Sequence, residues 1–136
     1  MKIALAQLNY TIGDIEGNKS KIIGAVERAK SEGADLVVFA EQALSGTPAL
    51  DLLCKTTFIE LCEEALDEIA SHCGRIAAVV GVPVLTEGGT VSAAAVIQHV
   101  EVERCISKRF ITARREMGLL LQGSGCETIT ICGARV

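Results

Sequence analysis

Short apolar runs and segments with helical spacing alternate along the 136-residue chain. Runs at residues 2–8, 36–39, 76–82 and 90–98 have the length and composition of buried strands. The run at 36–39 is continuous and bounded by polar residues, as is typical of a central parallel strand. Residues 100–106 follow the fourth run closely, so we expect them to form its antiparallel neighbour.

Two segments have the spacing of amphipathic helices. The first is predicted from Asn18, as its N-cap, to Ser31, with Gly33 just past its end. The second covers residues 58–73, where apolar side chains recur at every third or fourth position. Acidic residues occupy its opposite face, which we interpret as solvated surface rather than a binding site.

The predicted order is strand, helix, strand, helix and then three strands. This order is typical of an α/β fold whose helices cover one face of a sheet. Near the end of the chain, residues 128–132 and the residues from Ala134 onward predict two more strands that meet at Gly133. Because the chain stops at the beginning of a predicted strand, we expect residues 1–136 to be a single, truncated domain.

The composition, 49% hydrophobic and 22% charged, is that of a globular domain rather than a disordered chain. A net charge of −4 and 3% aromatic residues argue against nucleic-acid binding, which relies on basic surfaces and aromatic stacking. No apolar run approaches the roughly 20 residues of a membrane span, and the N-terminus lacks the pattern of a signal peptide. We therefore expect a cytoplasmic protein that binds neither nucleic acid nor membranes.

The six cysteines are expected to stay reduced in that compartment. No two of them form a CxxC pair, and the chain has only two histidines, so we assign no metal site. We interpret the cysteines instead as small, buried apolar residues.

Glu41 lies directly after the apolar run 36–39, in the stretch FAEQALSG. In open α/β sheets, groups just beyond the carboxyl ends of strands line the ligand crevice. A carboxylate there, next to buried surface, could act as a general base. It could equally cap the loop or pair with a lysine.

Lys108 lies just past another apolar strand end. Its ammonium group could stabilise a developing oxyanion. Four arginines are close to it in the sequence: Arg104, Arg109, Arg114 and Arg115. The same segment therefore also fits a solvated basic loop or an anion site. Neither a GxGxxG nor a P-loop pattern occurs to support nucleotide binding.

Five stretches, in a fixed order, carry a family resemblance: MKIALAQLNYTIGDIEGN, ADLVVFAEQALSGTPALDLL, AAVVGVPV, TVSAAAVIQ and SKRFIT. Together they resemble the nitrilase, or carbon–nitrogen hydrolase, superfamily. The GDIEGN stretch and residues 51–53 are most similar to the N-terminal glutaminase domains of glutamine-dependent NAD synthetases. The resemblance extends over essentially the whole chain. It implies a four-layer α-β-β-α sandwich, of which residues 1–136 would be roughly the N-terminal half.

The superfamily uses a Glu-Lys-Cys triad. By this resemblance Glu41 is the general base and Lys108 stabilises the oxyanion. The family's nucleophilic cysteine follows a strand whose beginning resembles residues 133–136, so we expect it just beyond residue 136. Cys126 and Cys132 precede that position and are not assigned the role. Residues 1–136 alone are then expected to be inactive, because a thiolate is indispensable to this chemistry.

The resemblance implies hydrolysis of the glutamine amide, with the ammonia passed to an ATP-dependent domain that makes NAD. The amidase half itself would need no metal or organic cofactor, and ATP and Mg²⁺ would belong only to a synthetase domain that these residues do not include. Two alternatives stay open: another amide or an N-carbamoyl compound as substrate, and a non-catalytic, truncated assembly module. We also expect a homo-oligomer or marginal stability, because a sheet cut through its middle leaves an unpaired edge and an uncovered apolar face.

Several positions depart from the family pattern. Ala40 stands where the family usually has proline, and Ser92 stands where asparagine is common. Thr47 and Ala49 also replace more usual residues. A further glutamate of the family, in the loop after the lysine, has no clear match; Glu116 is nearby, but we do not assign it that role. These departures bear on the identity of the amide more than on the reaction class.

Overall fold

The computed structural model of the protein describes residues 1–112, 114, 116–123 and 126–136. Strands β1 to β5 form one sheet in sequence order, and β6 and β7 form a separate two-stranded sheet. The elements are β1 (Ile3–Ala6), α1 (Ile15–Ser31), β2 (Leu36–Phe39), the 3₁₀ helix η1 (Leu50–Cys54), α2 (Thr56–Cys73), β3 (Ala77–Thr86), β4 (Gly89–Gln98), β5 (Glu101–Ser107), β6 (Thr130–Ile131) and β7 (Ala134–Arg135). The predicted order of elements is confirmed.

The sheet is parallel on one side and antiparallel on the other. β1, β2 and β3 run in the same direction, so β2 is the central parallel strand that its apolar run predicts. β3, β4 and β5 follow as an antiparallel meander. Two reversals return β5 to the direction of β2, so the carboxyl ends of β2 and β5 lie at the same edge of the sheet.

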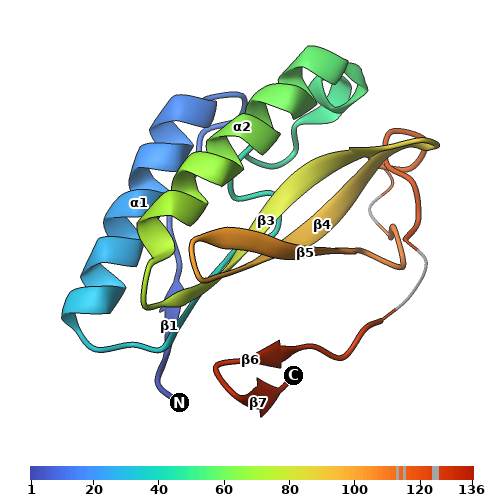
Figure 1. Ribbon diagram of the computed structural model, residues 1–136. Helices are drawn as coiled ribbons and strands as arrows, with labels where there is room; N and C mark the ends of the chain where they lie inside the picture. Colours follow the sequence, from blue (N-terminus) through green and yellow to red (C-terminus); the bar gives the residue numbers. More distant parts are fainter. Residues whose placement is uncertain (113, 115, 124–125) are drawn as a thin grey trace.

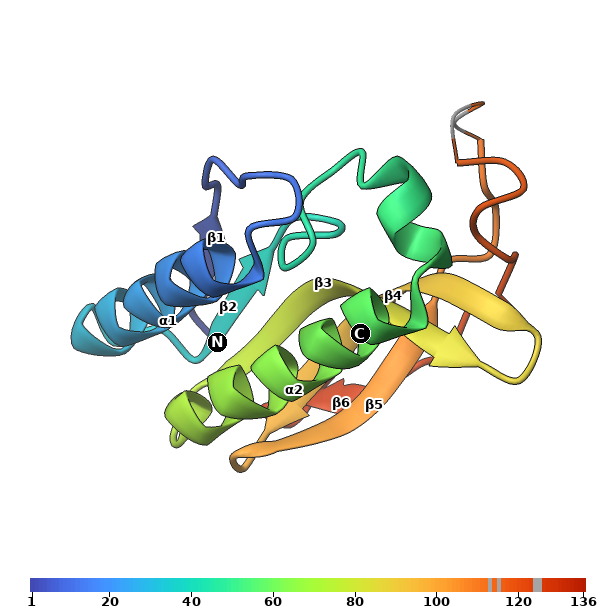
Figure 2. The same cartoon turned by 90° about the horizontal axis from the view of Figure 1, so that it is seen from above.

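Both helices cover one face of this sheet and lie side by side (Figure 1, Figure 2). The main hydrophobic core lies between the helices and the sheet. Ile22 of α1, Ile69 of α2 and Val80 of β3 are fully buried in it. Burying a side chain of this size contributes about 1.5–3 kcal/mol, which explains why the two helices stay on this face.

The start of α1 differs from the prediction. Asp14 is the N-cap, and its Oδ1 accepts a hydrogen bond from the Gly17 amide at 3.0 Å. Asn18 lies inside the helix and is fully buried. Its side-chain amide donates to the carbonyls of Thr11 and Leu44, so it joins two loops instead of capping the helix. The prediction that Asn18 caps α1 is therefore wrong.

β1 is not the buried strand that its apolar sequence predicts. It is the edge strand of the sheet, and Ile3 and Leu5 are 48% and 79% exposed. Both side chains belong to the sheet face opposite the helices. On that face the β6–β7 hairpin packs over the middle strands, where Ile131 is buried against Leu36 and Ala77 (Figure 1). The sequence pattern identifies apolar positions, but it does not identify which of them another layer covers.

The cysteines also differ from the prediction. All six are free thiols, but only Cys62 and Cys73 are buried. Burial raises the pKa of Cys62 to about 12 and that of Cys73 to about 11. The exposed ones are Cys54 at the end of η1, Cys105 in the edge strand β5, and Cys126 and Cys132 outside the helices and strands.

Neither helix in the described part of the chain is long and apolar enough to cross a membrane. The basic segment after β5 begins as a loop, as predicted, but residues 113 and 115 of that segment lie outside the described residues.

Candidate active site

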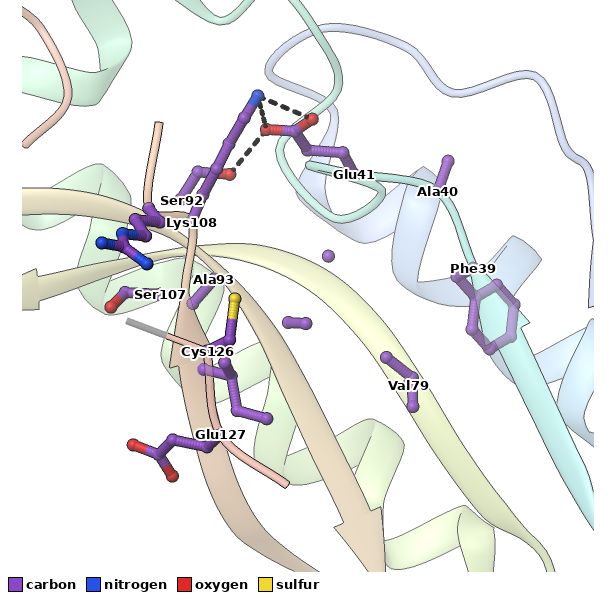
Figure 3. A pocket seen from close by; sticks show the side chains of 14 residues that line it. Phe39, Ala40, Glu41, Val79, Ser92, Ala93, Ser107, Lys108, Cys126 and Glu127 are labelled. Atoms are coloured by element: carbon purple, nitrogen blue, oxygen red, sulfur yellow. Dashed lines mark hydrogen bonds and ion pairs between the residues drawn. The ribbon is translucent and has the colours of Figure 1, made fainter. Parts of the chain in front are cut away.

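The topology brings the two predicted residues into contact. Glu41 follows β2 and Lys108 follows β5, at the edge of the sheet where both strands end. Lys108 Nζ donates hydrogen bonds to both carboxylate oxygens of Glu41, at 2.9 Å to Oε1 and 3.1 Å to Oε2 (Figure 3). The side chains are 31% and 48% exposed, respectively. An ion pair this accessible contributes at most about 1 kcal/mol to folding, so stability alone gives little reason for it.

A tight turn directs Glu41 toward Lys108. Gln42, the next residue, is buried and has a left-handed backbone with φ of 51°. The turn lies directly on Gly81 of β3, where a Cβ atom would come within 2.7 Å of Glu41 Cα. Gly81 is therefore the residue that allows the loop to approach the sheet.

The loop after Glu41 is also tied to the loop before α1. Asn18 Nδ2 donates to the Leu44 carbonyl at 3.0 Å, and the Gly13 amide donates to the Ser45 carbonyl at 2.9 Å. These bonds satisfy buried polar groups on both loops and restrict the position of the Glu41 turn.

Backbone hydrogen bonds hold Lys108 from two sides. Its amide donates to the Ser92 carbonyl of β4, and its carbonyl accepts from the Gly123 amide, both at 2.7 Å. The Ser92 hydroxyl donates to Glu41 Oε1 at 3.0 Å (Figure 3). β4 thus contacts both members of the Glu41–Lys108 pair.

Glu116 contacts the turn that carries Glu41 through Gln42, the residue that follows Glu41. It is 8% exposed, and its Oε1 accepts a hydrogen bond from Gln42 Nε2 at 3.3 Å. The spacing of the sequence contains no signal for this contact, since 74 residues separate the two side chains. Glu116 therefore supports the turn that carries Glu41.

A pocket of about 520 Å³ opens beside the Glu41–Lys108 pair. Its apolar lining comes mainly from β2, β3, β4 and β5, and its polar lining includes Glu41, Ser92, Ser107, Lys108, Arg109 and Glu127. It is large enough for a small organic molecule. Within residues 1–112, 114, 116–123 and 126–136, no three His, Cys, Asp or Glu side chains are grouped as metal ligands. A carboxylate and an ammonium group beside such a pocket can accept a proton and stabilise an oxyanion.

The structure separates the two cysteines that precede the expected nucleophile. Cys126 is exposed and lines the same pocket as Glu41 (Figure 3). Cys132 lies in the turn of the β6–β7 hairpin, and its thiol contacts the Asp35 carbonyl. Asp35 precedes β2 whereas Glu41 follows it, so the length of β2, about 13 Å, separates Cys132 from the pocket.

A comparison with protein families fits this geometry. The family model described as Carbon-nitrogen hydrolase matches residues 2–102, well over half of the chain. The chain belongs to the carbon–nitrogen hydrolase family. The predicted family resemblance is confirmed.

Similar curated proteins are glutamine-dependent NAD(+) synthetases. That of Aquifex aeolicus is 39% identical over 113 residues, which cover 82% of this chain and 20% of the relative. That of Xanthomonas campestris pv. campestris is 34% identical, over 100% of this chain and 26% of the relative. The chain thus spans about a fifth to a quarter of the length of these relatives.

Solved structures of this carbon–nitrogen hydrolase fold match closely. The glutamine-dependent NAD+ synthetase from Acinetobacter baumannii superposes with a TM-score of 0.88 and 28% identity, over 98% of this chain and 26% of that one. An amidase from Nesterenkonia sp., of the nitrilase superfamily, has a TM-score of 0.86 and 23% identity, over 99% of this chain and 53% of that one. The α/β, nitrilase-like fold class is confirmed, and the chain corresponds to about half of the amidase.

Proposed function

We propose that the protein hydrolyses the side-chain amide of glutamine, with Glu41 as general base and Lys108 as the oxyanion-stabilising residue. The observation that carries the proposal is the contact of Lys108 Nζ with both oxygens of Glu41 at the mouth of a pocket. Membership of the carbon–nitrogen hydrolase family supports the reaction class. The printed names of the relatives support glutamine as the amide.

In the proposed reaction a cysteine sulfur attacks the amide carbon while Glu41 accepts the thiol proton. The electron pair of the C=O bond moves to oxygen, where Lys108 Nζ stabilises the charge. When the intermediate collapses, the C–N bond breaks and Glu41 gives its proton to the nitrogen, which leaves as ammonia. Water, deprotonated by Glu41, then hydrolyses the thioester. The products are glutamate and the free thiol.

We assign the nucleophile to a cysteine that follows Val136. The thiols of Cys62 and Cys73 lie in the helical layer, and their raised pKa keeps them protonated at neutral pH. Cys132 lies at the far end of β2. Cys126 lines the pocket and is the competing thiol.

Covalent labelling distinguishes these thiols. The full-length protein is treated with a glutamine-derived diazoketone and digested, and the modified cysteine is identified by mass spectrometry. We expect the label on a cysteine after residue 136. We also expect a Cys126→Ser variant to keep its activity. Labelling of Cys126, with loss of activity in Cys126→Ser, would overturn the assignment.

The wider proposal concerns the use of the ammonia. The names of the relatives support its transfer to an ATP-dependent ligase that makes NAD. ATP and Mg²⁺ then serve that ligase, and the amidase site works without a cofactor. We further propose a cytoplasmic, homo-oligomeric protein. The exposed apolar side chains of Ile3 and Leu5 support association through the uncovered sheet face.

The test compares ammonia release by the full-length protein from glutamine, from other ω-amides and from N-carbamoyl compounds. We expect glutamine to be preferred. Glu41→Gln should reduce turnover by about 10²- to 10⁴-fold, the usual contribution of a general base, with an unchanged unfolding transition. Preference for another amide would change the substrate. Full activity of Glu41→Gln would remove Glu41 from the mechanism, and absence of ammonia from every amide would favour the non-catalytic assembly module.

A further inference from the structure

Ser92 is the third side chain at the Glu41–Lys108 pair, and the proposed reaction does not use it. It lies on β4 and is 2% exposed. Its hydroxyl donates to Glu41 Oε1 at 3.0 Å from the strand that also holds the Lys108 backbone (Figure 3). A buried hydroxyl aimed at a more exposed carboxylate restricts how that carboxylate can turn.

The contacts make the two oxygens of Glu41 different. Oε1 accepts two hydrogen bonds, from Ser92 Oγ at 3.0 Å and from Lys108 Nζ at 2.9 Å. Oε2 accepts one described hydrogen bond, from Lys108 Nζ at 3.1 Å. Each carboxylate oxygen has two lone pairs. Counting bonds from the described residues, both lone pairs of Oε1 are engaged, whereas Oε2 keeps one that can take a proton.

The backbone fixes this arrangement from three strands. Ala93 pairs with Ser107 in the β4–β5 ladder, and the bond from the Lys108 amide to the Ser92 carbonyl continues that register by one residue. Residues directly opposite each other in an antiparallel pair project from the same face of the sheet. The side chains of Ser92 and Lys108 therefore project from the same face of the sheet. Gly81 of β3 allows the Glu41 turn to approach that sheet closely.

We infer that Ser92 is a positioning residue, whose hydroxyl holds Glu41 Oε1 so that Oε2 is the atom that takes the proton of the nucleophile. The inference rests on the proposed function, because it concerns the same proton transfer. Without the hydroxyl, the carboxylate can rotate about its Cγ–Cδ bond and present either oxygen to Lys108. The proton then reaches an acceptor that is not held in the productive orientation.

The first test is the kinetics of Ser92→Ala in the full-length protein. We expect kcat for ammonia release from glutamine to fall about 10- to 100-fold, the range for one hydrogen bond to a charged group, with KM nearly unchanged. Ser92→Thr keeps the hydroxyl and should restore kcat to within about threefold of the wild-type value. A loss of the same size in Ser92→Thr would contradict the inference.

Thr90→Val is the matched structural control. Thr90 lies two residues away on the same face of β4, is buried, and donates its hydroxyl to the Leu53 carbonyl at 2.9 Å. Its removal should lower thermal stability without changing kcat, because Thr90 does not contact Glu41. Equal losses of kcat in Thr90→Val and Ser92→Ala would mean that Ser92 acts only through the stability of β4.

The outcomes separate this inference from the proposed function. An inactive wild-type protein, or a fully active Glu41→Gln variant, overturns the proposed function. If Glu41→Gln abolishes activity but Ser92→Ala keeps kcat within about twofold of the wild-type value, only the role of Ser92 is overturned. A crystal structure of Ser92→Ala decides independently of activity: we expect the Glu41 carboxylate to turn. An unchanged carboxylate contradicts the inference.

Discussion

Left-handed backbone at residues other than glycine occurs at both ends of the sheet, in different surroundings. At the end that carries Glu41, Gln42 has φ of 51°, is 1% exposed and bonds to Glu116. At the other end, His99 and Val100 form the exposed turn between β4 and β5, with φ of 54° and 63°. The left-handed region costs an L-residue about 1–2 kcal/mol, and a β-branched residue such as Val100 fits it least well.

The comparison indicates which of the two strained turns contributes to the candidate active site. Burial, the bond to Glu116 and the contact with Gly81 hold Gln42 in its conformation, and that conformation turns Glu41 toward Lys108. A two-residue turn with both φ values positive prefers Asn-Gly, so His99 and Val100 are poor residues for their position. Relief of the strain should therefore reduce function at one end and increase stability at the other.

The largest effect is expected for Gly81→Ala. The new Cβ would come within 2.7 Å of Glu41 Cα, so the turn must move away from β3. Ammonia release should fall by about 10²-fold or more, and the free energy of unfolding should fall by about 1–3 kcal/mol. Gly24→Ala is the control: in α1 its Cβ meets no atom within 4 Å, so it should add about 0.5–1 kcal/mol with unchanged activity. Wild-type activity in Gly81→Ala would show that the turn does not depend on this approach.

Substitution of Gln42 separates strain from hydrogen bonding. Gln42→Ala removes the donor to the buried Glu116 carboxylate and should cost about 1–3 kcal/mol in denaturant unfolding. Gln42→Gly loses the same bond but suits a positive φ, so it should be the more stable of the two variants by about 1 kcal/mol. Equal stabilities would mean that the backbone of residue 42 is not strained.

The exposed turn should respond in the opposite direction. The double substitution His99→Asn with Val100→Gly should raise the free energy of unfolding by about 1–2 kcal/mol, because both residues then suit their φ values. Activity should stay unchanged, since the turn lies at the end of the sheet opposite Glu41. A drop in stability, measured by denaturant unfolding, would contradict the assignment of strain to this turn.

The smallest effect is expected at Gln98, next to that turn. Its side chain bonds to the Thr130 carbonyl and to the Cys132 amide, and so anchors the β6–β7 hairpin to β4. Gln98→Ala should cost about 1 kcal/mol and speed amide hydrogen exchange in the hairpin. Unaltered exchange at Ile131 would show that apolar packing alone holds the hairpin.

Local patterns in the sequence determined most elements of the fold. The spacing of apolar residues predicted α2 almost to the residue, and the continuous run at 36–39 predicted the central strand β2. Both predictions are correct because helix and strand periodicity decide which side chains of one element share a face. The positions of Glu41 and Lys108 after strand ends follow from the same local patterns, and the family resemblance suggested their roles, which stay predictions.

Only the tertiary structure decided which of these residues meet. Asn18 joins two loops instead of capping α1, and the edge position of β1 leaves Leu5 exposed. The contacts of Glu41 with Ser92 and Lys108 join positions 51 and 67 residues apart. Local periodicity sets the direction of a side chain, but the partner that it meets depends on strand order and on close backbone approaches such as that at Gly81.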